Sequence, residues 1–190
     1  MLVIAQAGDG TADLVIDAVV ACGAVVARID TADFPSALSL AATPERIDSP
    51  GWLCVRGQRV DLGLVRSVYR RSPTSFAFPD GMSAPERRFA TLESVYGLGG
   101  VLCAQPWRWI DHPSAVADAS YKPRQLRVAT QSGLSVPRSL VTNVGARARE
   151  FAAEVGGALE CNPAGQWGWI ADETGLPIAE AIADELVRVP

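Results

Sequence analysis

Residues 1–30 read MLVIAQAGDGTADLVIDAVVACGAVVARID, and this stretch decides the fold of the N-terminal part. The apolar run from Leu2 to Gln6 predicts a buried strand. Residues 12–22 place apolar side chains at helical spacing and stop at Gly23, which predicts a helix. Residues 24–29 are apolar again and predict a second strand. This βαβ order predicts an α/β fold in which helices cover both faces of a parallel or mixed sheet.

Short strands are predicted after this opening. They share apolar residues between turn-forming residues, and they cover residues 38–41, 52–56, 59–62 and 65–71. The sequence Arg56-Gly57-Gln58-Arg59 between two of them indicates a hairpin turn.

A longer helix is predicted from a capping signal. Ser83 and Glu86 have the spacing of a capping box, in which the serine accepts from the third amide and the glutamate reaches back. The helix is expected to reach Tyr96 and to end at Gly97. After it, the sequence predicts a strand over 101–103 and a linker over 106–113.

The C-terminal part has a smaller set of elements. A helical pattern begins at Ser114, but proline does not fit a helix interior, so a new helix is expected to start at Pro123. Further on we expect strands over 136–142 and 158–161, a helix over 146–155, an extended segment at 169–170 and a helix over 177–187. A boundary near residue 115 then divides an α/β domain, 1–115, from a smaller part, 116–190.

Composition restricts the possible functions. The 190 residues carry a net charge of −4, and nucleic-acid binding is not expected because it needs a broad basic surface. No apolar run reaches the ~20 residues of a membrane span, so no membrane partner is expected. The four cysteines lie far apart in apolar segments. This favours buried free thiols in a reducing compartment, and we expect a cytoplasmic protein.

Arginine is the main source of positive charge, because Lys122 is the only lysine. Arg66, Arg70 and Arg71, with Tyr69 between them, could receive an acidic peptide or a phosphate through charge-assisted hydrogen bonds. The alternative is a strand that presents its arginines to solvent without a ligand.

Glu160 and Asn162 are candidate metal ligands. They are two residues apart in a segment predicted to be extended, so both side chains would leave the same face with oxygen atoms forward. Magnesium prefers oxygen ligands and completes its shell with water and phosphate. The alternative is the end of a strand at which the asparagine caps a loop.

The turn Gly8-Asp9-Gly10, with Asp30 about twenty residues on, imitates a dinucleotide-binding motif. Asp13 stands where that motif has its third glycine. Two carboxylates at a helix N-terminus would repel a pyrophosphate, so an ordinary tight turn is the better interpretation.

The segment LECNPAGQWGW, residues 159–169, resembles the metal-binding signature of ATP-grasp ligases that cross-link ribosomally made peptides, the MvdD-like or graspetide group. The N-terminal part resembles the pre-ATP-grasp domain of the same group. The segments that carry this second resemblance are residues 11–13, 28–30, 33–35, 65–69, 78–79, 82–87, 97–102, 121–123 and 133–138.

The resemblance implies a Rossmann-like pre-ATP-grasp domain over residues 1–115, followed by a truncated ATP-grasp (α+β) remnant over 116–190. It implies an enzyme class that uses ATP and Mg²⁺ to convert a carboxylate of a precursor peptide into an acyl phosphate, which an amine or hydroxyl attacks to form a lactam or ester cross-link. By this resemblance Glu160 and Asn162 are two magnesium ligands. Lys122, at a predicted helix entrance, is the candidate contact to the ATP phosphates.

The sequence departs from the family between Gly157 and Ala158. There the family has a phosphate-binding lysine strand, an adenine-clamping hinge, a peptide-binding region, and arginine and aspartate site residues. We therefore expect Mg-ATP binding to be weak or absent and the ligase reaction to be impaired. The alternative is a non-catalytic module that binds a precursor peptide or a full-length synthetase. A homo-oligomer and a split enzyme remain open.

Overall fold

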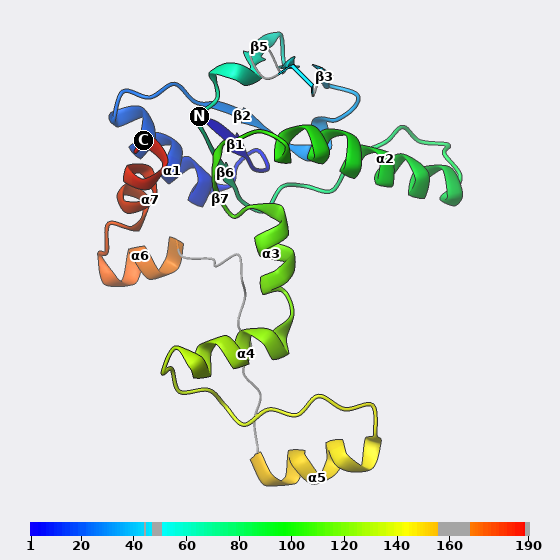
Figure 1. Cartoon of the computed structure of the whole chain (residues 1–190), viewed down its shortest axis with the longest axis vertical. Helices are drawn as coiled ribbons and strands as arrows, with labels where there is room; N and C mark the ends of the chain where they lie inside the picture. The colour runs from blue at the N-terminus through cyan, green and yellow to red at the C-terminus, as the bar shows by residue number, and fades with distance from the viewer. Residues whose placement is uncertain (44, 47–50, 156–167, 189–190) are drawn as a thin grey trace. The chain divides into compact units, whose positions relative to one another are not determined.

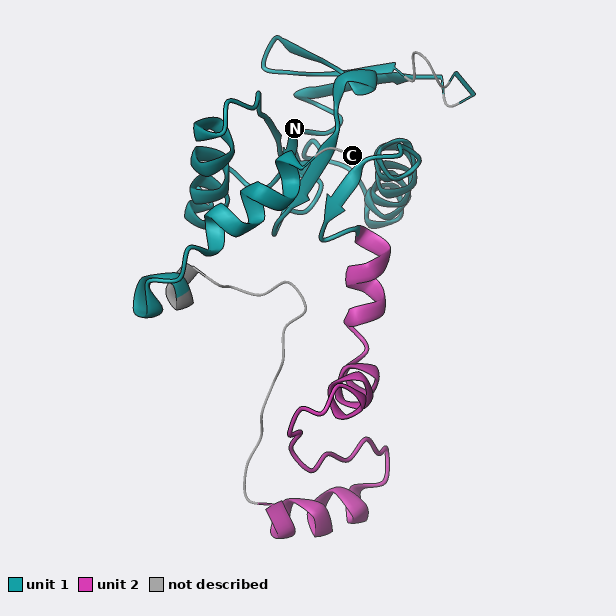
Figure 2. Ribbon diagram, turned by 60° about the vertical axis from the view of Figure 1, so that its left-hand side comes forward, with its two compact units in different colours: residues 1–112, 166–190 teal, residues 113–165 magenta. Residues whose placement is uncertain are grey.

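The computed structural model describes residues 1–43, 45–46, 51–155 and 168–188 (Figure 1). The chain divides into two compact units (Figure 2). The first unit joins Met1–His112 to Gln166–Pro190, and the second is Pro113–Gly165. No helix in the described part of the chain is both long and apolar enough to cross a membrane.

A parallel sheet forms the centre of the first unit. It contains β1 (Leu2–Ile4), β2 (Ala27–Ile29), β6 (Ser67–Arg70) and β7 (Arg108–Ile110) in the order β2-β1-β6-β7. All three strand pairs are parallel, with Leu2 opposite Ala27 on one side and Val68 on the other. The N-terminal βαβ prediction is therefore confirmed.

Helices cover both faces of this sheet, as the alternation of strands and helices predicts (Figure 2). On one face α1 (Gly10–Ala21) and α7 (Ile178–Val187) share a core with Val3 and Tyr69. On the other, Leu98 and Leu102 of α2 (Ala84–Cys103) pack with Leu2 and Val68. Successive strand residues point to opposite faces, and this alternation builds two cores from one sheet.

A second sheet is inserted between β2 and β6. It contains β3 (Leu38–Ala42), β4 (Gly51–Val55) and β5 (Gln58–Asp61), paired antiparallel in that order. Leu53 of β4 is completely buried in the core on the α2 side. The predicted hairpin turn is present, with positive φ at Arg56 and Gly57, as a two-residue turn between twisted strands requires. Two short 3₁₀ helices, Thr31–Asp33 and Leu62–Leu64, flank this sheet.

The second unit contains α3 (Pro113–Ala119), α4 (Lys122–Gln131) and α5 (Gly145–Val155). The helix start at Lys122-Pro123 is confirmed. None of the described residues 113–155 is buried, so these helices have no common core among those residues. The prediction of a strand over 136–142 is wrong: the segment has no sheet partner there and is exposed.

Four other expectations in the first unit are wrong. The helix α2 does not end at Gly97 but runs to Cys103, which also replaces the expected strand over 101–103. The segment 106–113 is not only a linker, because its centre forms β7. Residues 169–170 are not extended but lie in α6 (Gly168–Thr174).

The cysteines are free where they are described, but they are not buried as a group. Cys22 is exposed, and Cys54 and Cys103 are partly buried. Cys22 directly follows α1 and is its C-cap, so it lies at the end of the helix and not within it. The expectation of buried thiols is therefore wrong for Cys22. Cys161 lies outside the described residues.

Candidate functional site

The carboxyl ends of β1 and β6 meet at the point where the chain order of the parallel sheet reverses. From β1 the chain goes to β2 on one side, and β6 flanks β1 on the other. Open α/β sheets bind ligands in the crevice outside the strand ends at such a switch point. The residues that follow these two strands are therefore the first candidates for a site.

Two charged residues lie at these strand ends in the described structure. Asp9 is the N-cap of α1, and its Oδ1 accepts a hydrogen bond from the Ala12 amide at 2.9 Å. The same oxygen accepts from Nε of Arg71 at 3.3 Å, and both side chains are only 8% exposed. The Arg71 amide also donates to the Ile4 carbonyl. The ion pair thus connects the loop after β1 to the end of β6.

A second ion pair lies at the same helix N-terminus. Arg28 of β2 donates to Asp13 Oδ1 at 2.5 Å and also contacts the carbonyl oxygens of Ala5 and Gln6, just after β1. Two carboxylates, Asp9 and Asp13, therefore occupy the positive end of α1. This arrangement agrees with the interpretation of Gly8-Asp9-Gly10 as an ordinary tight turn.

Arg70 and Asp111 extend the cluster toward β7. Asp111 directly follows β7 in a left-handed conformation with φ of 64°. Burial raises the pKa of Asp111, while the charges of Arg70 and Arg71 oppose that rise. Burial likewise raises the pKa of the Cys103 thiol, again opposed by Arg70. We call Asp9, Arg70, Arg71 and Asp111 the carboxyl-edge cluster; its two acids and two bases balance in charge.

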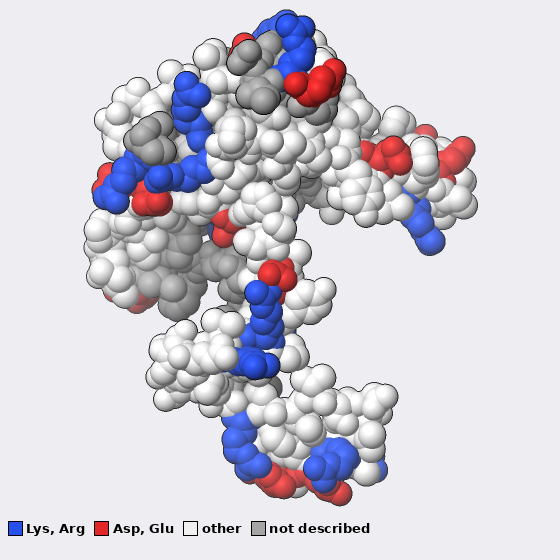
Figure 3. Space-filling model, viewed as in Figure 1, with Lys and Arg blue, Asp and Glu red and all other residues white. Residues whose placement is uncertain are grey.

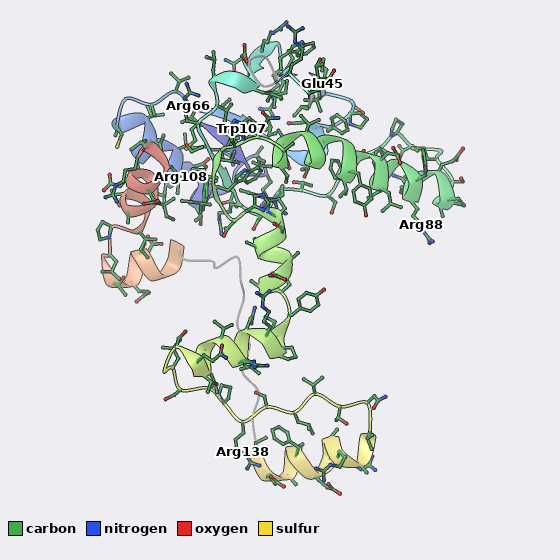
Figure 4. All side chains as sticks on the ribbon, in the orientation of Figure 1. Glu45, Arg66, Arg88, Trp107, Arg108 and Arg138 are labelled. Carbon is green, nitrogen blue, oxygen red and sulfur yellow. The ribbon has the colours of Figure 1, made fainter. Side chains whose placement is uncertain are left out.

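The structure does not bring the four candidates Arg66, Tyr69, Arg70 and Arg71 together on one face. Tyr69 is 2% exposed and packs in the core with α1 and α7. Arg71 pairs with Asp9. Arg66 precedes β6 at the opposite end of the strand, is exposed, and lies with Nη1 3.5 Å from the Gly63 carbonyl (Figure 4). A peptide or phosphate contact by these residues stays a prediction.

Lys122 is the first residue of α4, followed by Pro123. Its N-cap residue, Tyr121, makes no capping hydrogen bond with its side chain. The lysine is partly buried and engaged with a neighbour. Other basic side chains lie on the same unit, where Arg124 pairs with Asp118 and Arg138 with Glu154 (Figure 3).

Glu160 and Asn162 lie outside the described residues. Within the described ranges, no group of three or more His, Cys, Asp and Glu side chains could hold a metal ion. The carboxyl-edge cluster does not fit a magnesium ion either, because one of its two carboxylates is already paired with Arg71. The metal pair therefore stays a prediction from the sequence.

Residues 1–117 match the family described as the MvdD pre-ATP-grasp domain. The chain belongs to this family. No curated protein matches the sequence. The match begins at Met1 and ends inside α3, so it includes every strand among the described residues and the entire carboxyl-edge cluster. The Rossmann-like pre-ATP-grasp prediction for the N-terminal part is thereby confirmed.

Solved structures of macrocyclases and peptide ligases share this fold. Macrocyclase MdnC of Microcystis aeruginosa MRC, bound with precursor peptide MdnA, is 27% identical, with a TM-score of 0.72 over 80% of this chain and 50% of that chain. The ATP-grasp ligase PsnB, complexed with a minimal precursor variant, Mg and ADP, is 27% identical, with a TM-score of 0.61 over 82% and 51%. The chain thus spans about half the length of these two relatives.

Macrocyclase MdnB of the same organism shares the fold over a larger fraction. The two chains are 21% identical, with a TM-score of 0.86, and the match covers 99% of each. At this identity the similarity shows the fold alone. The fold of this chain is therefore also found in that solved chain.

Sequence reasoning missed two members of the carboxyl-edge cluster as site residues, Asp9 and Asp111. Asp9 directly precedes a helix and is an N-cap residue type, which was a usable signal. Asp111 follows a three-residue strand that no periodicity reveals. No pattern near residue 111 could therefore have identified it.

Proposed function

We propose that this chain acts in the ATP-dependent maturation of a ribosomally made precursor peptide, as a homologue of the ATP-grasp ligases that form lactam or ester cross-links. The observation that carries the proposal is the family match over residues 1–117. The 27% identity to MdnC, which was solved with its precursor peptide, supports a peptide as the partner. The PsnB complex with Mg and ADP supports ATP and magnesium as the cofactors of the class.

In this class of reaction ATP phosphorylates a side-chain carboxylate of the peptide, and an amine or hydroxyl of the same peptide displaces the phosphate. Magnesium, when bound, offsets the charge on the phosphate oxygens. Lys122 would contact phosphate from the start of α4, where helix amides favour an anion. Glu160 and Asn162 would supply oxygen ligands to the metal.

A second candidate function is a non-catalytic module that binds the precursor peptide or a full-length synthetase. It is favoured by the second unit, whose described residues 113–155 form helices without a strand or a buried residue. An adenine-binding cleft is normally built on rigid, packed elements. We accordingly expect Mg-ATP to bind weakly to the chain by itself.

The test combines binding with product analysis. Calorimetry with Mg-ATP and with a candidate acidic precursor peptide measures the two affinities separately. Mass spectrometry after incubation with both measures the loss of one water per cross-link. Dehydrated peptide supports the ligase, and peptide binding without dehydration supports the binding module. If the peptide is neither bound nor dehydrated, both proposals are contradicted.

Lys122→Ala tests the proposed phosphate contact. We expect it to weaken whatever Mg-ATP binding is measured, because it removes the only ammonium side chain of the chain. Arg127→Ala is the matched control, since Arg127 is an exposed basic residue of the same helix. Equal effects of the two substitutions would contradict a specific role for Lys122.

A further inference from the structure

The strand β5 is an edge of the second sheet, because the order β3-β4-β5 places no described strand on its other side. Val55 and Gln58 flank the two-residue turn and lie opposite each other, so they form a hydrogen-bonded pair. Pairs alternate along an antiparallel ladder, and the next pair, Cys54 and Arg59, is therefore not hydrogen-bonded. The backbone N–H and C=O of Arg59 consequently point away from β4, and no described residue bonds to them. This edge thus offers a donor and an acceptor to another strand.

The side chain of Arg59 is held over an aromatic ring on the outer face of the same sheet. Its guanidinium carbon lies 4.7 Å from the centre of the Trp52 ring. Arg59 is exposed, whereas Leu53 and Val60, which have the opposite orientation, contribute to the core. None of the ion pairs among the described residues includes Arg59. Stacking on a ring orients a guanidinium and leaves the N–H groups at its edge free for a bidentate pair with a carboxylate.

The region around this edge is positively charged, although the whole chain has a net charge of −4. Residues 51–66 contain three arginines and a single acid, Asp61. The carboxylate of Asp61 is used locally, because it accepts a hydrogen bond from the Gly63 amide at 2.8 Å. Basic side chains are visible over β5 in the space-filling view (Figure 3). A strand that pairs with this edge is therefore expected to carry carboxylates.

We propose that β5 binds an extended peptide with carboxylate side chains, which adds to the second sheet as a further antiparallel strand. In this mode of recognition main-chain hydrogen bonds give affinity and alternate side chains give specificity. The peptide residue opposite Arg59 exchanges both backbone hydrogen bonds with it, and its side chain lies on the same face as the guanidinium. A glutamate at that position pairs with Arg59, and glutamates two residues away share its face. The inference rests on the proposed function only in that the partner is a peptide.

The first test measures the binding of a heptapeptide that alternates threonine and glutamate, by calorimetry with the full chain and without ATP. Arg59→Ala and Arg59→Lys should each weaken binding at least about tenfold, because neither alanine nor lysine forms a bidentate pair with a carboxylate. Arg66→Ala is the matched control, since Arg66 is exposed on the same unit but lies outside β5; it should change the affinity less than about twofold.

Two results of this test would overturn the proposal. One is the absence of binding at peptide concentrations up to roughly 1 mM. The other is full affinity of Arg59→Lys. A charged residue that only protects a sheet edge from pairing needs no guanidinium, so that result would assign Arg59 a protective role.

The second test changes the peptide and keeps the protein. Glutamine in place of glutamate removes the charges and should weaken binding at least about tenfold. N-methylation of the glutamate amides removes the donors that face β5 and should abolish binding, whereas N-methylation of the threonine amides alters the outer edge and should change the affinity less than about threefold. Equal affinities of the two methylated peptides would overturn strand addition, and an equal affinity of the glutamine peptide would overturn recognition by charge.

These measurements use no ATP and are therefore independent of the ligase reaction. Failure of the peptide to bind at β5 would leave the dehydration test of the proposed function standing. Absence of dehydrated product would in turn leave the binding result at β5 standing.

Discussion

The two units differ in the amount of core that supports their helices. In the first unit α1, α2 and α7 each bury side chains against a parallel sheet. In the second unit α3, α4 and α5 bury none among the described residues, although the start of α4 at Lys122-Pro123 and the amphipathic patterns of α4 and α5 are recognisable in the sequence. Most helical stability in proteins comes from packing of an apolar face. The difference shows that local signals predict where a helix forms but not how firmly it is held.

Amide hydrogen exchange should give the largest contrast between the units. We expect amides of β1 and β6 to exchange only through global unfolding, and those of α4 and α5 to exchange faster by a factor on the order of 1,000 or more, because local opening there exposes no core. Exchange followed by mass spectrometry measures both in one experiment. Equal protection of α5 and β1 would contradict the comparison.

Removal of a core leucine should give the next largest effect. Leu53→Ala creates a cavity at a completely buried position and should lower the free energy of unfolding by roughly 3 to 5 kcal/mol. Leu140→Ala in the second unit, where the leucine is 39% exposed, should cost less than about 1 kcal/mol. Urea unfolding of both variants checks this. Similar losses would mean that the second unit is also supported by a core.

Breaking the buried ion pair should cost less than removing a core leucine. Asp9→Asn keeps an N-cap residue for α1 and an oxygen that can accept from Arg71, but it removes the charge that balances the guanidinium. We expect this substitution to lower the free energy of unfolding by about 2 kcal/mol, measured by urea unfolding. Asp13→Asn breaks the more exposed pair with Arg28, whose side chains are 24% and 49% exposed, and should cost at most about 1 kcal/mol. A larger loss for Asp13→Asn would reverse this ranking.

The capping box of α2 should contribute less still. Ser83 Oγ accepts from the Glu86 amide at 3.4 Å, and the Ser83 amide donates to Glu86 Oε2 at 2.7 Å, as the sequence predicts. The Ser83 hydroxyl, which donates to Glu86 Oε2 at 2.6 Å, and then the Ser83 amide lower the pKa of the Glu86 carboxyl. Ser83→Ala should cost roughly 1 kcal/mol in thermal unfolding. Ser139→Ala, in the second unit, removes a hydroxyl that bonds only a local carbonyl and should change nothing measurable.

The smallest expected effect is a pH dependence at Asp111. Because burial raises its pKa, the folded protein holds this proton more tightly than the unfolded chain does. Its contribution to stability therefore falls as pH rises above the ordinary value of 3.8. Asp111→Asn cannot ionise and tolerates the left-handed conformation. As pH rises from about 4 to 7, its free energy of unfolding should increase by a few tenths of a kcal/mol relative to wild type. A difference that stays constant between about pH 4 and pH 7 would contradict this sign.

The sequence predicted the βαβ opening, the hairpin and the capped helix because each depends on residues that are close in the chain. It failed where distant packing decides the structure. The helix α2 continues through Gly97, Gly99 and Gly100 because Leu98 and Leu102 are held in the core of the sheet, and tertiary packing overrides weak helix propensity. The expected strand over 136–142 has no partner, and a lone strand has no reason to form.

The candidate site was less predictable than the fold. The Asp9–Arg71 pair joins residues that are 62 positions apart, and only the order β2-β1-β6 brings them together. The alternation of a strand does indicate that Arg70 and Arg71 point to opposite faces. It could not show that Tyr69 would be among the most completely buried large side chains.

After the segment Pro113–Gly165 the chain returns to the first unit and ends there with helix α7. Helix α7 packs on α1, and Arg108 of β7 holds it through Glu185 at 2.8 Å. The parts of the chain before and after the segment Pro113–Gly165 therefore belong to one folded unit. Doubling the length of a segment closed in this way costs only about 0.6 kcal/mol of chain entropy. Segments of very different length can thus replace Pro113–Gly165 without a change in the core of the first unit.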